Sequence, residues 1–319
     1  MLKIAIDIMG GDNSPKEPIC GIKSYIKENS DKNTFFYVVG NKKSALALID
    51  DTIPRDQYKI ISTTQEIEMN DRPSKMLREK PDSSMIRCVE LLKDSKVNAI
   101  ISAGNTGALL LSSSIMIKKI ANVKKAVLAP IIPNQFGNFI LADVGANINL
   151  KPRHFIDMAN LCKIYFESIK NTRTPNIHLL NIGSEKNKGT ADLIETHELL
   201  SKKMKNFKGN IEARDLMNTK LDIVLCNGFV GNITLKLIEG LSHFLFDTLK
   251  ESSNDLKTNS NIDSLKDMFD FEICTLLLGI NGIVLKCHGS SKRNSFKNAI
   301  IEAEKINNSG LISKISANF

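Results

Sequence analysis

Short runs of aliphatic and β-branched residues alternate with longer amphipathic stretches along most of the chain. The short runs, such as residues 34–40 (TFFYVVG) and 98–103 (NAIISA), predict strands. The longer stretches, such as residues 83–95 and 153–171, space their apolar residues as a helix does. Strands that alternate with helices are typical of a mostly parallel sheet covered by helices, so the pattern predicts an α/β fold.

The same pattern places the individual elements and predicts one α/β unit over residues 1–319. Strands are expected at residues 3–9, 34–40, 58–63, 98–103, 126–132, 138–145, 177–183, 206–213, 222–228 and 282–289. Helices are expected at residues 15–30, 44–51, 83–95, 153–171, 190–206 and 232–253, and after the strand at 98–103. No internal repeat of fixed period is visible.

The helix expected at residues 232–253 carries a broad apolar stripe, formed by Leu237, Ile238, Leu241, Phe244, Leu245 and Leu249. Such a stripe is typical of a core or a subunit interface, and otherwise of a helix that lies on a membrane. The polar segment 251–267 follows as an exposed turn. We therefore expect an amphipathic helical hairpin at about residues 232–275 as a subdomain.

Composition and charge exclude several classes of protein. With 319 residues, 42% of them hydrophobic, the chain can bury a large core and is not disordered. Six scattered cysteines fit buried residues in a reducing cytosol, rather than a disulfide frame or a metal site. No apolar run is long enough to cross a bilayer, so we expect a soluble protein or one that lies on a membrane surface. The net charge of +8 suits an acidic partner, but no basic run or aromatic platform indicates nucleic acid.

Three loops of small residues each lie between a predicted strand and a predicted helix: residues 9–15 (MGGDNSP), 102–108 (SAGNTGA) and 226–232 (CNGFVGN). At such a helix start, unpaired backbone N–H groups and the helix dipole bind anions. Each loop alone could instead be a turn that needs glycine. Together they would gather at the carboxyl edge of one sheet, which favours a phosphate-bearing substrate. The candidate binding residues are Gly10, Gly11, Asp12, Ser102, Gly104, Asn105, Thr106, Gly107, Gly228, Gly231 and Asn232.

Motifs for nucleotide binding and for a protein nucleophile are missing. The chain has no G-x-G-x-x-G, and residues 183–190 (GSEKNKGT) only resemble a Walker loop. His288, after the last predicted strand, could act as an acid or base, or could be structural. Arg78 and Lys80 could hold a phosphate or an acidic carrier, or could belong to a solvated basic loop. The attacking group could thus belong to the substrate.

Eight segments occur in a fixed order along the chain: MGGDNSPKEP, MNDRPSKMLREKPDSSM, ISAGNTGALL, ADVGANINLKPRHF, LLNIGSEKNKGT, NFKGNIEARD, CNGFVGNITLKLIEG and LLGINGIVLKCHGSS. In this order they closely resemble the PlsX phosphate acyltransferases of bacterial phospholipid synthesis. The resemblance spans nearly the whole chain. It implies transfer of a long acyl chain from acyl carrier protein to inorganic phosphate, giving acyl phosphate for the glycerol-3-phosphate acyltransferase. It also implies a three-layer α/β/α fold like phosphotransacetylase and isopropylmalate dehydrogenase, no cofactor, and a cytoplasmic homodimer loosely associated with the inner face of the membrane.

Two positions depart from the family pattern. Asn227 stands where members usually carry aspartate, and Ala213 where they usually carry glycine. An asparagine keeps a hydrogen-bond acceptor but loses the charge, so an orienting role would survive where an essential base would not.

The resemblance suggests a mechanism in which phosphate itself attacks the thioester. We expect Asn105, Thr106 and the N–H groups after Gly104 to hold phosphate, and backbone donors near Gly228 or Gly231 to stabilise the oxyanion. His288 or Lys188 would protonate the departing thiolate. The basic residues Arg72, Arg78 and Lys80 would attract the carrier protein, and the stripe at 237–249 with residues 161–166 (LCKIYF) would line an acyl channel. The alternatives are a phosphotransacetylase that uses acyl coenzyme A, a non-catalytic membrane scaffold and, less favoured, a dehydrogenase of related fold.

Overall fold

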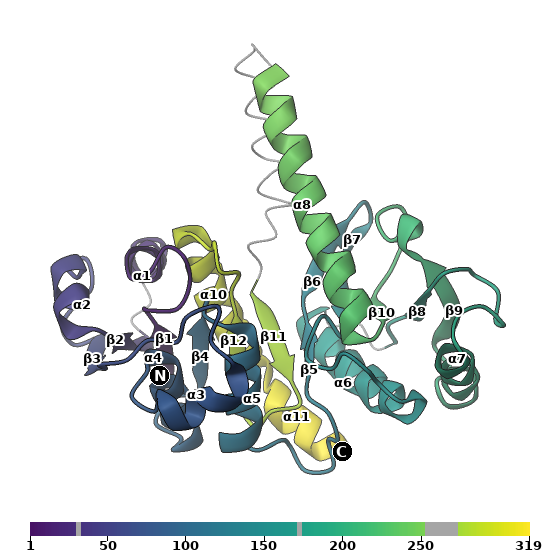
Figure 1. Cartoon of the computed structure of the whole chain (residues 1–319), viewed down its shortest axis with the longest axis horizontal. Coiled ribbons are helices and arrows are strands. Elements are labelled where there is room, and N and C mark those ends of the chain that lie inside the picture. Colours follow the sequence, from purple (N-terminus) through teal and green to yellow (C-terminus); the bar gives the residue numbers. More distant parts are fainter. Residues whose placement is uncertain (30–32, 171–173, 253–273) are drawn as a thin grey trace. The chain divides into compact units, whose positions relative to one another are not determined.

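The computed structural model describes residues 1–29, 33–170, 174–252 and 274–319 (Figure 1). Where the sequence pattern predicts one unit, the chain divides into two compact units. Unit 1 comprises Met1–Ala126, Ser168–Lys170 and Glu272–Phe319, and unit 2 comprises Val127–Glu167 and Asn171–Phe271. The turn and second arm of the expected hairpin at 232–275 fall almost wholly outside the described residues.

The sheet of unit 1 contains β1 (Leu2–Asp7), β2 (Thr34–Gly40), β3 (Tyr58–Ser62), β4 (Ala99–Ser102), β11 (Thr275–Leu278) and β12 (Ile283–Lys286). These strands run in the order β3, β2, β1, β4, β12 and β11. All are parallel except β11, which pairs antiparallel with β12. Because Ile6 pairs with Ile101 and Ser102 with Lys286, the carboxyl ends of β1, β4 and β12 lie side by side.

The helices of unit 1 are α1 (Lys16–Glu28), α2 (Lys42–Leu48), α3 (Pro73–Glu79), α4 (Ser84–Lys93), α5 (Thr106–Met116), α10 (Arg293–Ser309) and α11 (Leu311–Asn318). The chain runs outward from β1 to β3 and then returns to β4 on the other side of β1. Right-handed crossovers therefore put α1 and α4 on opposite faces of the sheet. The gap between β1 and β4 is a switch point, where open α/β sheets bind ligands.

Unit 2 contains β5 (Val127–Ala129), β6 (Ile131–Asn134), β7 (Gly137–Ala142), β8 (Ile177–Asn181), β9 (Phe207–Glu212) and β10 (Ile223–Leu225), with α6 (Pro152–Lys170), α7 (Ala191–Lys203), the 3-10 turn η1 (Ala213–Asp215) and α8 (Gly228–Ser252). Its five-stranded sheet has the order β6, β7, β10, β8 and β9. The single strand expected at residues 126–132 is split at Pro130 into β5 and β6, since proline has no N–H to donate to a ladder.

Two apolar stretches of unit 2 differ in exposure. Leu161, Cys162, Tyr165 and Phe166 of α6 are buried in the core, so the prediction that residues 161–166 line an acyl channel is wrong. On α8 the stripe is outward, with Leu237, Leu241, Phe244, Leu245 and Leu249 exposed. Among the described helices, none combines the length and the apolar character needed to span a bilayer.

Candidate active site

A buried hydrogen-bond network closes the carboxyl edge of the sheet in unit 1. The Asp7 carboxylate, at the end of β1, is fully buried and accepts the Ser102 hydroxyl of β4 at 2.6 Å. It also accepts the backbone N–H groups of Met9 at 3.1 Å and Gly10 at 3.0 Å. Ser102 Oγ in turn accepts the N–H of Gly104 at 3.1 Å. One buried carboxylate thus fixes both loops that leave the switch point.

The two loops touch at their glycines. A Cβ atom built on Gly10 would lie 2.7 Å from the nitrogen of Gly104 and 2.5 Å from Asp7 Oδ2. No side chain fits at those distances, so the glycine is needed here for close approach of two backbones. A third loop joins them, because the N–H of Asp12 donates to the carbonyl of Gly289 at 2.7 Å. Gly10, Gly11, Asp12, Ser102 and Gly104 are thereby brought together.

Asn105 caps α5 and holds a distant segment. Its Oδ1 accepts the N–H of Ala108 at 3.0 Å, as an N-cap residue does. Its Nδ2 lies 2.9 Å from the carbonyl of Met69 and 3.2–3.3 Å from those of Glu68 and Asp71. The side-chain amide that was expected to hold phosphate is therefore occupied by residues 68–71. In the first turn of α5, the N–H groups of Thr106 and Gly107 have no acceptor among the described residues.

The loop after β12 carries a buried cation and an exposed histidine. Lys286 is buried, and its ammonium donates to the carbonyls of Ala103, at 3.2 Å, and Cys287. His288 is exposed, and its Nδ1 accepts the N–H of Ser290 at 3.3 Å and lies 2.8 Å from Ser290 Oγ. In the neutral ring the proton therefore lies on Nε2. Both groups lie at the edge that also holds Asp7 and Ser102.

The predicted carrier-binding residues lie on and beside α3. Arg72 and Arg78 are exposed, whereas the Lys80 ammonium pairs with Asp71 at 2.5 Å. The hydrogen bond from Lys80, with that from the N–H of Glu68, lowers the pKa of the Asp71 carboxyl. Lys80 therefore fixes the segment that Asn105 holds, and the two arginines keep a free approach from solvent.

Unit 2 has a second buried aspartate at the end of a strand. Asp143, directly after β7, is fully buried and accepts the N–H groups of Leu128, Ala146 and Asn147 and the side-chain amide of Asn147, at 2.6–3.1 Å. Burial raises the pKa of the Asp143 carboxyl, and these four donors oppose that shift. Burial, and then Asp143, raise the pKa of the neighbouring Cys226 thiol, which disfavours a thiolate nucleophile there.

The start of α8 packs directly on the loop that Asp143 holds. The N–H of Gly228 donates to the carbonyl of Asn147 at 2.8 Å, and the N–H of Gly231 donates to that of Asn227 at 2.9 Å. The N–H groups of Gly228 and Gly231 themselves are therefore already bonded, and an oxyanion donor near them must be a neighbouring N–H group. Asn227 Oδ1 accepts the N–H of Val230 at 2.9 Å, so Asn227 caps the helix. In this first turn, the N–H of Phe229 has no acceptor among the described residues.

The prediction that all three glycine loops gather on one sheet is wrong for the third. The loops at residues 9–15 and 102–108 lie on the sheet of unit 1, and the loop at 226–232 follows β10 in the sheet of unit 2. Asn232 lies one turn into α8 beside Gly145. Lys188, also in unit 2, is half exposed and lies 3.9 Å from Glu185.

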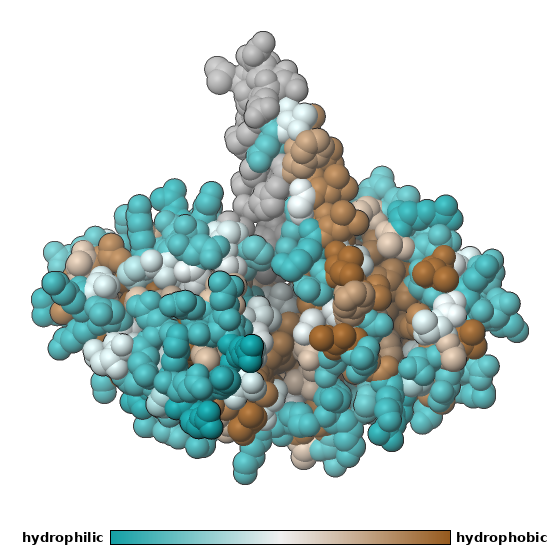
Figure 2. Space-filling view, viewed as in Figure 1, coloured by the Kyte–Doolittle hydropathy of each residue, from teal (hydrophilic) through white to brown (hydrophobic). Residues whose placement is uncertain are grey.

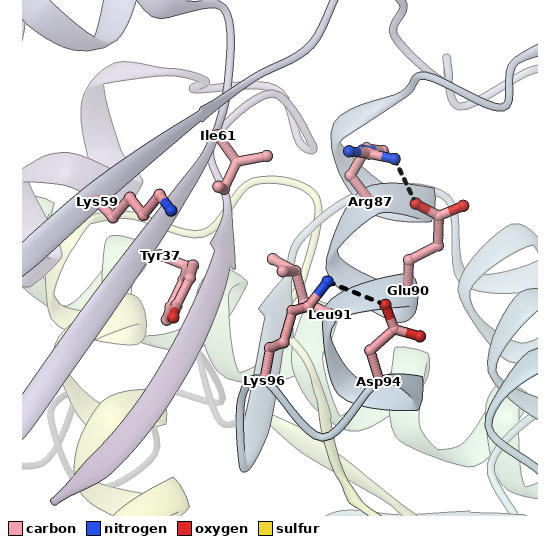
Figure 3. Close-up of a pocket in the computed structure, with 8 residues that line it drawn as sticks. All are labelled: Tyr37, Lys59, Ile61, Arg87, Glu90, Leu91, Asp94 and Lys96. Atoms are coloured by element: carbon pink, nitrogen blue, oxygen red, sulfur yellow. Dashed lines mark hydrogen bonds and ion pairs between the residues drawn. The ribbon is translucent and has the colours of Figure 1, made fainter.

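A cavity of about 230 Å³ lies on the flank of α4 in unit 1, away from these loops (Figure 3). Tyr37, Lys59, Ile61, Arg87, Glu90, Leu91, Asp94 and Lys96 line it. Its charges largely neutralise each other, because Arg87 pairs with Glu90 at 2.7 Å and Lys96 with Asp94 at 3.1 Å. It contains none of the predicted site residues, so we place the chemistry at the loops instead.

The chain is similar in sequence to a known family of proteins. The family model described as fatty acid synthesis protein matches residues 2–314. The phosphate acyltransferase of Clostridium novyi (strain NT) is 36% identical, over 99% of this chain and 98% of that protein. The phosphate acyltransferase of Clostridium acetobutylicum is 38% identical, over 98% and 97% of the two chains.

Several solved structures have a similar fold, among them a phosphotransacetylase and a branched-chain phosphotransacylase. A phosphotransacetylase from Streptococcus pyogenes has a TM-score of 0.63 at 16% identity, covering 96% of this chain and 94% of that one. A branched-chain phosphotransacylase from Enterococcus faecalis V583 has a TM-score of 0.61 at 14% identity, covering 96% and 98%. At these identities the likeness concerns the fold alone, and it confirms the predicted three-layer α/β/α class of phosphotransacetylase type.

Proposed function

Because the chain belongs to the fatty acid synthesis protein family, and its relatives are phosphate acyltransferases, we propose that it transfers a fatty acyl group to inorganic phosphate. The observation that carries this proposal is the convergence of three loops on the switch point of unit 1, held by the bond between Asp7 and Ser102. Parallel-sheet edges of this kind bind phosphate groups through backbone N–H donors. The donor of the acyl group would be a thioester of acyl carrier protein.

Phosphate would bind at the start of α5. The N–H groups of Thr106 and Gly107 and the Thr106 hydroxyl supply donors there, and the buried ammonium of Lys286 adds positive charge beneath the loop. Asn105 would act as a positioning residue, because its amide is already bonded to residues 68–71. The geometry thus favours a backbone site over the side-chain site that the sequence suggested.

The acyl thioester would bind at the start of α8 in unit 2. The N–H of Phe229 and the side-chain amide of Asn232, one turn later, would donate to the oxyanion. In the reaction as a whole, a C–O bond between phosphate and the acyl carbon forms and the C–S bond of the thioester breaks. The departing thiolate needs a proton, for which the imidazolium of His288 and the ammonium of Lys188 are the proposed donors. Asn227 caps the helix that carries the oxyanion donors.

The chain would work as a cytoplasmic homodimer at the inner face of the membrane. Its exposed stripe on α8, Leu237, Leu241, Phe244, Leu245 and Leu249, offers an apolar surface for a second subunit or for lipid. Acyl phosphate is reactive and apolar at one end, which suits delivery to a glycerol-3-phosphate acyltransferase in the membrane. Sedimentation and vesicle flotation of the purified protein test the two contacts separately.

Phosphate-dependent formation of acyl phosphate tests the main proposal. Purified protein is mixed with phosphate and either acyl carrier protein or coenzyme A thioesters, and the product is trapped with hydroxylamine. We expect product with the carrier protein thioester. Faster turnover with coenzyme A would assign the chain to the phosphotransacetylases, and no product with either donor would reject acyl transfer.

Charge reversal on α3 tests the carrier protein. Arg78→Glu should raise the KM for acyl carrier protein about tenfold at low salt and leave the KM for phosphate unchanged, because Arg78 is exposed and its charge steers an acidic partner. The matched control is Arg214→Glu in unit 2, whose side chain is similarly exposed. Equal effects of the two variants would exclude α3 as the docking surface.

A further inference from the structure

Exposed apolar side chains gather around the start of α8 in unit 2. Phe229 and Ile233 point outward from the first turns of the helix, Ile148 lies in the loop that Asp143 holds, and Ile182 follows β8 with 80% of its surface exposed. We call these four residues the apolar rim. Figure 2 shows hydrophobic surface on unit 2 at the foot of α8 and along the helix. Exposure of several large aliphatic groups in one place is uncommon on a surface without a ligand.

The sheet and its loops hold the rim residues next to one another. The N–H of Gly228 donates to the carbonyl of Asn147, so Phe229 and Ile148 are each one residue from the same hydrogen bond. On the other side, β10 pairs in parallel with β8, with Leu225 opposite Leu179, so the segments that leave their carboxyl ends, one with Phe229 and one with Ile182, start side by side. The rim residues therefore lie on the helix start that carries the N–H of Phe229, the donor that the proposed function assigns to the oxyanion, and on the two segments next to it.

An acyl group bound by that donor must place its hydrocarbon chain among its immediate neighbours, because the chain is covalently attached to the carbonyl carbon. The rim residues carry no charge and no hydrogen-bonding side chain, and methylene groups gain free energy from such contacts alone. Resting on the proposed function, we propose that the apolar rim (Ile148, Ile182, Phe229 and Ile233) binds the hydrocarbon chain of the acyl donor and sets the preference for long chains.

The position of the rim relative to the other apolar surfaces supports this occupant. The rim lies at the carboxyl edge of the sheet, where β7, β8 and β10 end beside the Asp143 loop. Phe136, which is equally exposed, lies in the turn between β6 and β7 at the opposite, amino end of β7. The exposed residues Leu241, Phe244 and Leu249 lie several turns further along α8 and fit a flat surface such as a lipid or a second subunit.

Chain-length dependence of the reaction tests the proposal. For wild type, Ile182→Gln, Ile148→Gln and the control Phe136→Gln, kcat/KM is measured with a series of acyl carrier protein thioesters from butanoyl to hexadecanoyl. We expect wild type and control to gain rate with each added pair of methylenes. We expect the two rim variants to lose about tenfold with hexadecanoyl and less than about twofold with butanoyl donor, which flattens the slope. Both substituted positions are exposed, so folding is preserved.

Any other result contradicts the proposal that the apolar rim binds the hydrocarbon chain. A slope unchanged in both rim variants, or an equal loss with every chain length, would overturn it even though the enzyme makes acyl phosphate. Rim variants that keep the slope but change the sedimentation coefficient, or that no longer bind anionic vesicles, would assign the surface to a second copy of the chain or to lipid. Absence of product from wild type with every donor would reject the proposed function itself.

Discussion

Replacing Asn105 with serine should release residues 68–71 from the start of α5 while the helix keeps its cap. Serine is a good N-cap residue, so its hydroxyl can still accept the N–H of Ala108. It has no amide to reach the carbonyls of Glu68, Met69 and Asp71, which lie 2.9–3.3 Å from Nδ2. The variant therefore separates the two tasks of one side chain.

The size of the effect follows from the number of donors. An amide nitrogen has two hydrogens, so at most two of the three carbonyls are fully bonded at once. At about 0.5–1.5 kcal/mol for each bond, the segment should lose ~1–3 kcal/mol of local stability. Its backbone amides should then exchange with solvent about 5- to 150-fold faster. Asn105→Ala should lose about 1 kcal/mol more, because the cap is also removed.

Hydrogen exchange measured by mass spectrometry on peptides covering residues 64–80 and 106–116 provides the readout. We expect Asn105→Ser to speed exchange in the first peptide and to leave the second unchanged, and Asn105→Ala to speed both. If the first peptide exchanges at the wild-type rate in Asn105→Ser, the amide does not hold that segment. The phosphate KM supplies a second check, since a positioning residue should raise it by much less than the removal of a direct ligand would.

Three further substitutions, one of them with a matched control, test the structural basis of the sites. Gly231→Ala should cost at least about 3 kcal/mol of unfolding free energy, because its Cβ would lie 2.0 Å from the carbonyl oxygen of Asp143. The control Gly240→Ala, on the exposed face of the same helix, should instead stabilise the protein by about 0.5–1 kcal/mol. Urea unfolding measures both changes. Asp143→Asn should lose ~2–4 kcal/mol, since an amide cannot accept all four donors. Because the pKa of Asp143 is raised in the folded protein, the free energy that Asp143 adds to folding is full below the ordinary pKa of 3.8 and declines as pH rises through the folded pKa. The difference in unfolding free energy between wild type and Asp143→Asn should therefore shrink as pH rises over that range. A difference that stays constant with pH would refute the raised pKa. Lys286→Met should raise the KM for phosphate about tenfold and leave the KM for the acyl donor within about twofold, and an equal change in both would show that Lys286 only supports the fold.

The hydrophobic pattern predicted the fold class and most elements because burial in a parallel sheet leaves a local signature. All ten predicted strand runs contain a strand, with the run at 126–132 divided by Pro130. The helices α3, α10 and α11 and the antiparallel strand β11 were not predicted. Thr275–Leu278 of β11 is fully buried and adjoins a second apolar run, so its pattern does not distinguish one long element from a hairpin.

The candidate site was predicted less completely, because its residues take their roles from non-local contacts. The spacing of Gly104 and Gly107 indicates a loop before a helix, but nothing near Asn105 shows that Met69 will bond to its amide. Likewise, residues 226–232 and residues 9–15 both place glycines and a polar residue between a strand and a helix, and only the pairing of the strands assigns the two loops to different sheets. The prediction that they share a sheet failed for this reason.

Asp7 and Asp143 share a sequence signal that indicates the shape of the loop that follows each of them. Each follows a run of buried strand residues directly, is itself fully buried, and accepts backbone N–H groups from residues two to four positions later. An unpaired carboxylate in such a place would cost several kcal/mol, so its position is tolerated only because the loop supplies donors. The same requirement constrains the loop, since its N–H groups must point inward at the carboxylate. An aspartate at the end of a buried strand before a glycine-rich loop therefore indicates a loop of fixed shape. Among the described residues, the N–H groups that neither the aspartate nor the helix cap uses include those of Thr106 and Gly107 in one unit and that of Phe229 in the other.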